Sequence, residues 1–371
     1  MRRRTQTFQQ QISPLIKCQR QTIRQALTSM NEIEVEAIRV ADILRNTRAI
    51  LDELDEQFEE KTSLSKMDIK FLFLATGLQC LRQYVFSNDA FRFNKHDDGD
   101  KLIGRIVPKK WHDVLLASVP YDATKRSIEF DERTGLSGFT HRYRTLGHDP
   151  ILGWFFGPVN IITDSLTKSD IITTYSVTDK KISGAYQGGT FGAISDCISS
   201  INVEKKLLPV AVMRQALHFG ADYFTKQGLP VPILPSLNND MAASLVTKFN
   251  IDMYSITRGA TLAILINAII GYIHTLFYKE EHDGSPAFFE VRTRKILTYS
   301  NILASASNII AVAVQSFMGN AAALKQLDIG GLFVTLYRIL TDYRYVYQIK
   351  ADFLSNQLYS TLMSDSHAGE N

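Results

Sequence analysis

The chain has 371 residues, of which 45% are hydrophobic and 21% are charged, a composition that is typical of a globular protein and excludes a disordered one. Its 41 basic residues nearly balance its 38 acidic residues, so the net charge of +3 offers no general attraction for nucleic acid, and we expect no nucleic-acid partner. The three cysteines show no CxxC or Cys/His spacing, which argues against a disulfide framework or a zinc finger and fits a cytoplasmic location.

Residues 1–90 are predicted to form a helical hairpin. Apolar side chains from Ile23 to Phe58 recur at intervals of three, four or seven residues, the spacing of a long amphipathic helix. A second, more buried helix is expected over about residues 65–86. We interpret the hairpin as a packing or dimerisation element that self-associates through residues 20–60. The basic start of the chain lacks an apolar stretch, so we expect no secretory signal peptide.

Residues 91–205 are predicted to combine loops, short strands and short helices. Glycines and the absence of a hydrophobic period indicate loop between Gly135 and Gly147. Pro150 is expected to open an apolar helix, and the β-branched stretch Ser169–Asp179 is the best strand candidate in the chain.

The His148-Asp149 pair carries a metal-site hypothesis. A histidine followed at a distance by a His-Asp pair, and then by a later aspartate, resembles the order of ligands in HD-type metal phosphohydrolases. This resemblance implies a divalent metal held by imidazoles and carboxylates, with His141 and Arg142 or Arg144 facing a substrate phosphate. The metal ligands that it implies are His112, His148, Asp149 and either Asp164 or Asp222.

Two other interpretations of the same stretch stay open. In HD-type enzymes the pair lies within a helix, whereas here a glycine precedes it and a proline follows it. This pattern is typical of a helix start, with Asp149 as the N-cap and Pro150 at the first helical position. In the third interpretation, Arg142, Arg144 and His148 converge on that helix N-terminus and form an anion- or nucleotide-binding site. Neither of these alternatives requires a metal or another cofactor.

Residues 206–363 are predicted to form a helical bundle. The stretch Leu207–Gly220 is expected to be one helix, on which His218 is interpreted as a hydrogen-bonded core histidine. The last residues, 364–371, are expected to be a frayed tail.

An apolar hairpin, residues 259–324, is the strongest hydrophobic feature of the sequence. Its arms, 259–278 and 296–324, contain no formally charged residue, and the first just reaches the length that a membrane-spanning helix needs. Polar residues interrupt both arms, and these fit either a packed soluble core or the interior of a membrane bundle. The polar residues singled out on this hairpin are Asn267, His274 and Asn308.

These elements predict a mainly α multi-helix bundle with an N-terminal long-helix hairpin and a small irregular or β insertion in the middle. The function that they favour is non-enzymatic association, in the manner of a bacterial toxin-like or defence-like effector that contacts a membrane through residues 259–324. The alternatives are an HD-like metal-dependent phosphohydrolase and an anion- or nucleotide-binding module centred on residues 141–149.

Overall fold

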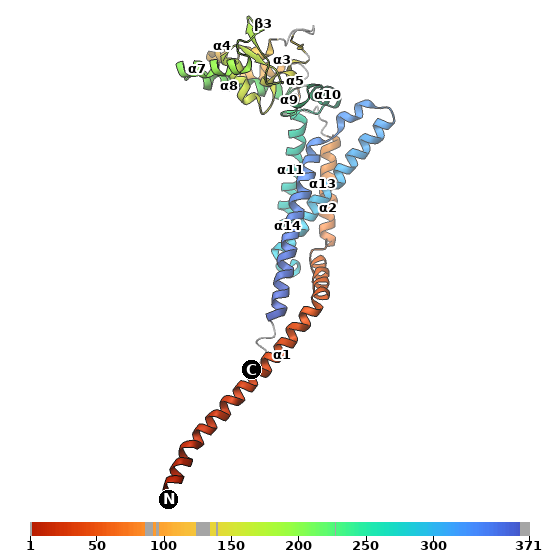
Figure 1. Cartoon of the computed structure of the whole chain (residues 1–371). Coiled ribbons are helices and arrows are strands. Elements are labelled where there is room, and N and C mark those ends of the chain that lie inside the picture. The colour runs from red at the N-terminus through yellow and green to blue at the C-terminus, as the bar shows by residue number, and fades with distance from the viewer. Residues whose placement is uncertain are drawn as a thin grey trace. The chain divides into compact units, whose positions relative to one another are not determined.

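The protein is mainly α-helical, as predicted, and its described residues contain one small β-sheet (Figure 1). The computed structural model describes residues 2–85, 92–93, 96–123, 134–138, 140–226 and 228–363, with the backbone alone for residues 2–16, 96–97 and 321. The predicted tail, residues 364–371, lies outside the described residues.

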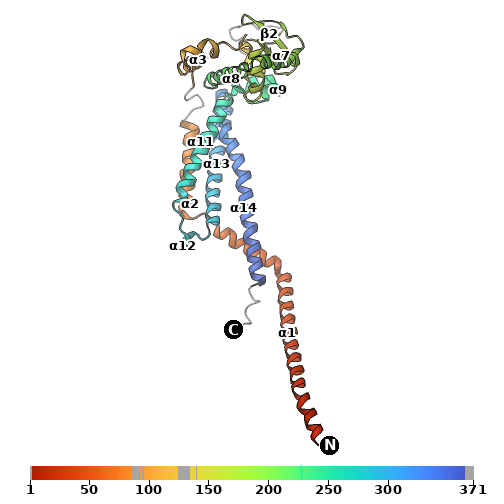
Figure 2. The same ribbon diagram turned by 90° about the vertical axis from the view of Figure 1, so that its left-hand side faces the viewer.

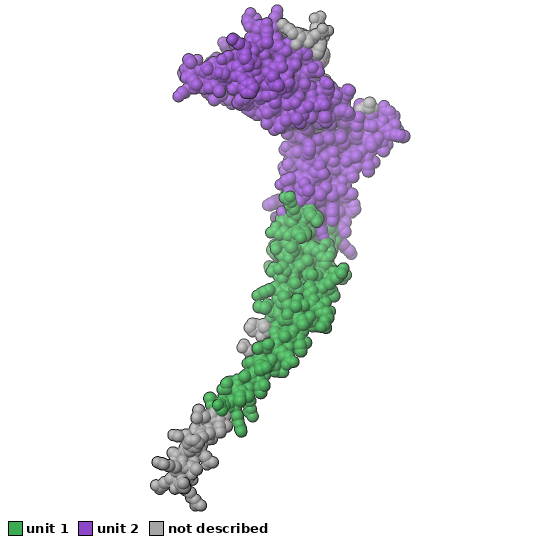
Figure 3. Space-filling model, in the orientation of Figure 1, with its two compact units in different colours: residues 1–64, 278–292, 343–371 green, residues 65–277, 293–342 purple. Residues whose placement is uncertain are grey.

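The chain divides into two compact units (Figure 3). Unit 1 consists of residues 1–64, 278–292 and 343–371, and unit 2 consists of residues 65–277 and 293–342. Both units are therefore assembled from segments that are distant in the sequence.

Unit 1 is built around the long helix α1 (Arg2–Lys61). It also contains α12 (Glu280–Asp283), the start of α13 (Pro286–Phe317) and the end of α14 (Ile329–Met363). Phe58 is fully buried here, because its ring packs against Phe288 and Phe353 at centroid distances of 6.0 and 5.8 Å.

The middle region, residues 92–252 of unit 2, contains helices of different lengths around a small hydrophobic core. Tyr121, Leu136 and Leu166 are completely buried in that core. Its helices are α3 (His96–Ile106), η1 (Lys109–Trp111), α4 (His112–Leu115), η2 (Pro120–Asp122), α5 (His141–Arg144), η3 (Leu146–His148), α6 (Gly153–Ile162), α7 (Gly189–Val203), α8 (Leu207–Tyr223), α9 (Leu234–Leu237) and α10 (Asn239–Phe249).

The sheet of the middle region is antiparallel, with the order β1 (Ser165–Thr167), β2 (Thr174–Thr178) and β3 (Lys181–Ala185). Strand β2 lies inside the predicted strand, whose first half forms the turn that follows β1. Asp179 and Lys180 join β2 to β3 with φ angles of 51° and 62°, which gives a two-residue hairpin turn its usual left-handed backbone.

The helical bundle of unit 2 comprises α2 (Lys66–Val85), α11 (Met253–Thr275) and the unit 2 residues of α13 and α14, which run side by side in both views (Figures 1 and 2). A short helix, η4 (Ala321–Gln326), joins the last two. Asp252 begins α11 with a capping box, because its carboxylate accepts from the Ser255 N–H while the Ser255 hydroxyl accepts from the Asp252 N–H. Most of the first apolar arm, 259–278, thus lies in α11, and the second arm, 296–324, begins in α13 and ends in η4.

Candidate metal centre

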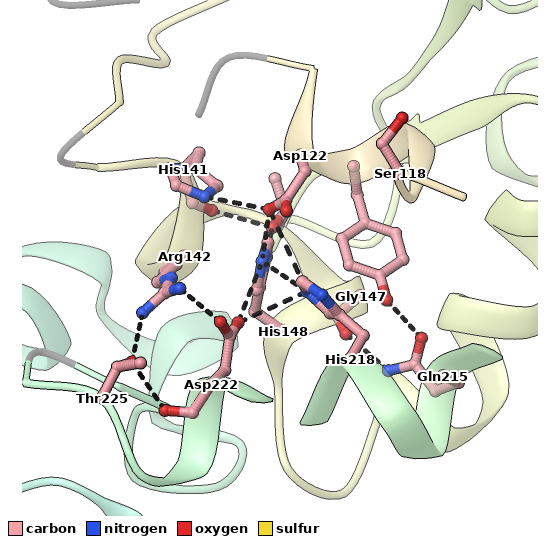
Figure 4. Close-up of polar contacts among 12 residues, drawn as sticks. Ser118, Asp122, His141, Arg142, Gly147, His148, Gln215, His218, Asp222 and Thr225 are labelled. Carbon is pink, nitrogen blue, oxygen red and sulfur yellow. Dashed lines mark hydrogen bonds and ion pairs between the residues drawn. The ribbon is translucent and has the colours of Figure 1, made fainter. Parts of the chain in front are cut away.

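Three imidazoles and two carboxylates converge in the middle region (Figure 4). Short elements supply three of them: Asp122 ends η2, His141 begins α5 and His148 ends η3. The long helix α8 supplies His218 and Asp222, which are four residues apart and therefore share one face of the helix. We call these five residues the His/Asp cluster.

The ring Nε2 atoms of the His/Asp cluster point at one another and at the two carboxylates. His148 lies at the centre, with its Nε2 atom 3.0 Å from Asp122 Oδ1 and 3.3 Å from His218 Nε2. The Nε2 atom of His141 is 3.2 Å from the same Asp122 oxygen. On the other side, His218 Nε2 is 3.3 Å from Asp222 Oδ2.

The His/Asp cluster is buried, and this burial sets its charges. Burial lowers the pKa of His148 to about 3, and the hydrogen bond and charge of Asp122 do not offset it. Burial acts to raise the pKa of both carboxyl groups, but for Asp222 the Arg142 guanidinium, together with His218 and His148, outweighs burial and lowers the pKa. For Asp122 the neighbouring imidazoles outweigh burial, His218 first among them. The surroundings therefore favour a neutral His148 beside two ionised carboxylates.

The backbone fixes the tautomer of His141. Its Nδ1 atom lies 2.9 Å from the carbonyl oxygen of Gly138, which can only accept a hydrogen bond. Nδ1 must therefore carry the ring proton, and in the neutral ring Nε2 keeps a lone pair. That lone pair faces a carboxylate oxygen of Asp122, which is also an acceptor.

A hydroxyl group fixes the tautomer of His148 in the same way. Thr145 Oγ1 donates to the His141 carbonyl oxygen at 2.8 Å, so the same hydroxyl accepts from His148 Nδ1 at 2.7 Å. In the neutral His148 ring, the Nε2 atom therefore carries a lone pair and no proton.

Acceptors that face acceptors in a buried site repel one another unless a proton or a metal cation lies between them. Two buried atoms of the cluster, His141 Nε2 and Asp222 Oδ2, have no hydrogen-bond partner. Imidazole nitrogens and carboxylate oxygens are the usual ligands of Zn²⁺, Fe²⁺ and Mn²⁺ in proteins. The residues of the His/Asp cluster thus fit a divalent transition-metal ion.

Two overlapping triads could hold such an ion. One consists of Asp122, His141 and His148, and the other of His148, His218 and Asp222. Because Nε2 of His148 has one lone pair, it can bind a single ion, so the two triads cannot each hold an ion through His148. The residues that would hold an ion are therefore His148 together with the other members of either triad.

Neighbouring side chains hold the ligands in place. The Arg142 guanidinium pairs with Asp222 Oδ1 and also donates to Thr225 Oγ1 at 3.3 Å. On the opposite side, Gln215 donates from Nε2 to the Gly147 carbonyl at 2.8 Å and accepts from the buried Tyr121 hydroxyl. Such outer contacts orient metal ligands and are a regular part of metal sites.

Asp149, predicted either as a ligand or as a helix cap, lies outside the His/Asp cluster. Its Oδ1 atom accepts from the backbone N–H groups of Ile151 and Leu152, both at 2.9 Å, and its Oδ2 atom accepts from the Ile233 N–H at 2.6 Å. These are the contacts of a capping residue, although the helix that follows, α6, begins at Gly153 and not at Pro150.

Two further predicted ligands also lie outside the cluster. His112 begins α4 and places its Nε2 atom 2.9 Å from the Val107 carbonyl oxygen. Asp164 occupies the turn before β1, where its backbone has a φ of 46°. Of the predicted ligands, the structure brings together His148 and Asp222, with His141 beside them.

The two arginines of the predicted anion site form ion pairs with different aspartates. Arg142 pairs with Asp222 in the interior, whereas Arg144 pairs with the exposed Asp240 at 3.2 Å and donates to the Gly135 carbonyl. Only Arg142 therefore lies beside the His/Asp cluster, and its charge is already engaged. Anion binding at this stretch stays a prediction.

Sequence reasoning missed Asp122 and interpreted His218 as a hydrogen-bonded core histidine without connecting it to the other members of the His/Asp cluster. One signal could have found the second: His218 and Asp222 form a His-x-x-x-Asp pair on a helix, a spacing that places two ligands on one face. Asp122 carries no such signal, because its partners are distant in the sequence. Comparison with protein-family models, with curated proteins and with solved structures finds no match to this chain.

Proposed function

We propose that this protein is a metal-dependent hydrolase that acts on phosphoesters and is embedded in a membrane through its helical bundle. The observation that carries the hydrolase proposal is the inward convergence of Nε2 lone pairs on two ionised carboxylates. A divalent ion bound there supplies a Lewis acid for the phosphoryl oxygen and acidifies water toward a pKa of about 7.

The composition of the candidate ligand set supports a hydrolytic role. The two triads offer more donor atoms than a closed four-coordinate structural zinc site uses, and they include no cysteine. Cys197 is buried elsewhere, on α7, and Cys18 is exposed on α1. A mixed imidazole and carboxylate set of this kind is typical of hydrolytic metal centres.

Metal analysis of the full-length protein tests the site. We expect the protein purified without chelators to retain zinc, manganese or iron, and His148→Ala and His218→Ala to lose it. The matched control is His112→Ala, which removes a histidine outside the cluster and should keep the wild-type metal content. A wild-type protein that holds no metal and takes up neither Zn²⁺ nor Mn²⁺ would contradict the proposal.

Hydrolysis of bis-p-nitrophenyl phosphate tests the reaction. We expect turnover by the metal-loaded protein, its loss on treatment with a chelator, and its return when the metal is restored. His112→Ala should retain this activity. Absence of turnover in a protein with full metal content would contradict the phosphoesterase proposal while leaving metal binding intact.

The distribution of polarity in the helical bundle supports the membrane proposal. Two helices, α11 and α13, are long and apolar enough to cross a membrane. Leu265, Ile269 and Ile310 on these helices are 52, 46 and 61% exposed. The interior is instead polar: Asn267 accepts hydrogen bonds from Gln79 and Asn301 at 3.1 and 2.8 Å. A helical bundle in lipid favours this arrangement, in which apolar side chains face outward and polar side chains form hydrogen bonds in the interior.

Other interior contacts of the bundle follow the same pattern. His274 lies between Asp68 and Thr293, with both ring nitrogens 2.8 Å from their oxygen partners. Asn308 accepts from the backbone N–H of Asp328 at 2.9 Å. All three predicted hairpin residues, Asn267, His274 and Asn308, are thus buried and hydrogen-bonded to neighbouring elements.

We expect the protein to stay in the membrane fraction after washing with carbonate, and release by that wash would contradict the membrane proposal.

Self-association through residues 20–60 is a second candidate function. It is supported by the apolar stripe of α1, on which Ile23, Leu27, Met30 and Leu44 are 59 to 67% exposed. A stripe of this spacing is the seam by which helices pair. Sedimentation of the detergent-solubilised protein should give a dimer or larger species, and Leu27→Glu with Met30→Glu should give the monomer. A monomeric wild-type protein would contradict it.

A further inference from the structure

A cavity of about 620 Å³ lies among α11, α13 and α14 in the bundle of unit 2. This volume is within the range of small-molecule sites. Gly271, the buried Leu297 and Phe333, which is 57% exposed, are among the residues that line it. Gly271 widens the cavity, because it has no side chain to fill the space beside Leu297.

Asn267 places an unused hydrogen-bond donor on the wall of this cavity. Its Oδ1 atom already accepts from Gln79 Nε2 and Asn301 Nδ2, which fixes the orientation of the amide. The Nδ2 group is therefore turned away from those donors, and it is buried without a hydrogen-bond partner. A buried amide donor without a partner is costly, so a ligand acceptor in the cavity would stabilise it.

Arg338 adds positive charge to the same wall. Its guanidinium is 2.9 Å from Asp342, but that carboxylate is shared with Arg294, also at 2.9 Å. The Nε–H group of Arg338 is buried and has no hydrogen-bond partner. The cavity thus combines apolar walls with two unused donors, one of them on a cation.

We propose that the cavity binds an anionic lipid, with the acyl chain along the apolar wall and an acidic head group or its ester carbonyl on Asn267 and Arg338. An acyl chain fits because the helices that form the cavity carry apolar side chains on their outer faces. An acidic head group fits because both unused groups are donors. This inference rests on the membrane part of the proposed function and is independent of the His/Asp cluster.

Photolabelling of the full-length protein in detergent tests the site. The probes are a palmitic acid and a phosphatidylglycerol, each with a diazirine on the acyl chain. We expect labelled peptides that contain Ala268 or Phe333, both of which line the cavity. Labelling by the fatty acid alone identifies a free acid as the ligand, and labelling by the phospholipid alone identifies a membrane lipid; both outcomes support the site. Absence of these labelled peptides with both probes overturns it.

Two variants separate specific binding from general adherence to apolar surface. Ala268→Phe fills the cavity, and Asn267→Leu removes the amide donor; each should lower labelling by about tenfold. The matched control is Ala313→Phe, the same change on an exposed position of α13 that does not line the cavity, and it should label like the wild type. Unchanged labelling of Ala268→Phe overturns the proposal.

The charge of the head group is tested with the methyl ester of the palmitic acid probe and with diazirine phosphatidylcholine. Each should label about tenfold less than its acidic counterpart, and equal labelling overturns the requirement for an acid. The thermal unfolding midpoint of every variant is measured in the same detergent and should lie close to that of the wild type, which shows that the chain is folded. A wild-type protein without metal contradicts the hydrolase proposal alone. Release by carbonate contradicts the membrane proposal on which the lipid site rests, whereas absence of labelling in a protein that stays in the membrane fraction overturns the lipid site alone.

Discussion

At the scale of single residues, Thr145 sets which ring nitrogen of His148 is available to the proposed metal ion. Its hydroxyl accepts from His148 Nδ1 and thereby directs the Nε2 lone pair toward Asp122 and His218. We expect Thr145→Val, which keeps the size and removes the hydroxyl, to lower zinc affinity by about 10- to 100-fold in a chelator competition assay. Thr145→Ser keeps the hydroxyl and should restore the affinity. Equal affinities of all three proteins would contradict this role.

Replacement of Asp149 should lower the stability of the protein without changing its metal content. Its carboxylate accepts three backbone N–H bonds from Ile151, Leu152 and Ile233, and it is completely buried. Asp149→Ala leaves those donors without partners, so we expect the free energy of unfolding to fall by about 2 kcal/mol, measured by denaturant titration. Metal content at saturation should stay at the wild-type level. Loss of the metal at unchanged stability would instead favour the predicted ligand role.

The sequence identified part of the site because some of its signals are local. The resemblance to HD-type enzymes implied His148 and Asp222 as ligands and His141 as a residue that faces substrate phosphate, and the structure brings these three residues together. Asp122 and His218 are 96 residues apart in the sequence, and a pattern of nearby residues cannot predict that such a pair lies close together. Asp149 was ambiguous for a different reason: a carboxylate next to a histidine has the same residue pattern whether it binds a metal or caps a helix.

At the scale of elements, α6 and α8 pack closely enough to position the cluster. Gly157 on α6 faces Gln215 on α8, and a Cβ atom at Gly157 would overlap the Gln215 amide. That amide also holds the Gly147 carbonyl, next to His148. We expect Gly157→Ala to lower the free energy of unfolding by about 1–3 kcal/mol, and to weaken zinc binding because Gln215 must move. Gly77→Ala, on α2 in open space, is the control and should change neither quantity. Wild-type stability of Gly157→Ala would show that the helices can separate without cost.

Long helices were predictable from the sequence, and the short elements that carry the ligands were not. The apolar spacing along α1 and the uncharged runs of α11 and α13 extend over many turns, so the periodic signal is strong. In contrast, α5 has four residues and η3 has three, too few for any period, and they fall in a stretch predicted to be loop. Buried polar contacts, such as that of Thr145 with His148, hold these elements in place.

At the scale of the whole molecule, the sequence left open whether the apolar hairpin is a soluble core or a membrane element. In a soluble core other helices would cover α11 and α13, yet only 22 and 44% of their most apolar windows are buried. Composition alone could not decide this point, because buried and lipid-facing helices have similar residues. The folded bundle shows which side chains face outward: the Asn267 amide is buried inside the bundle, and Leu265 is exposed on its surface.

Leu265→Arg distinguishes lipid from water around the bundle. Leu265 lies near the middle of α11 and is 52% exposed. In water, a surface change of this kind shifts stability by about 0.5 kcal/mol or less. At the centre of a membrane helix, an arginine costs about 2.5–3.5 kcal/mol. We therefore expect Leu265→Arg to lower the amount of folded protein in membranes and its thermal stability in lipid nanodiscs.

The control for this change is Leu237→Arg, at a position on α9 in the middle region that is 77% exposed. Because this position is proposed to face water, the control should match the wild type in both membrane yield and thermal stability. If Leu265→Arg matched the wild type as well, or raised the yield of soluble protein, the outer face of α11 would face water. The exposed apolar side chains would then require a protein partner to cover them, and the membrane proposal would have to be abandoned.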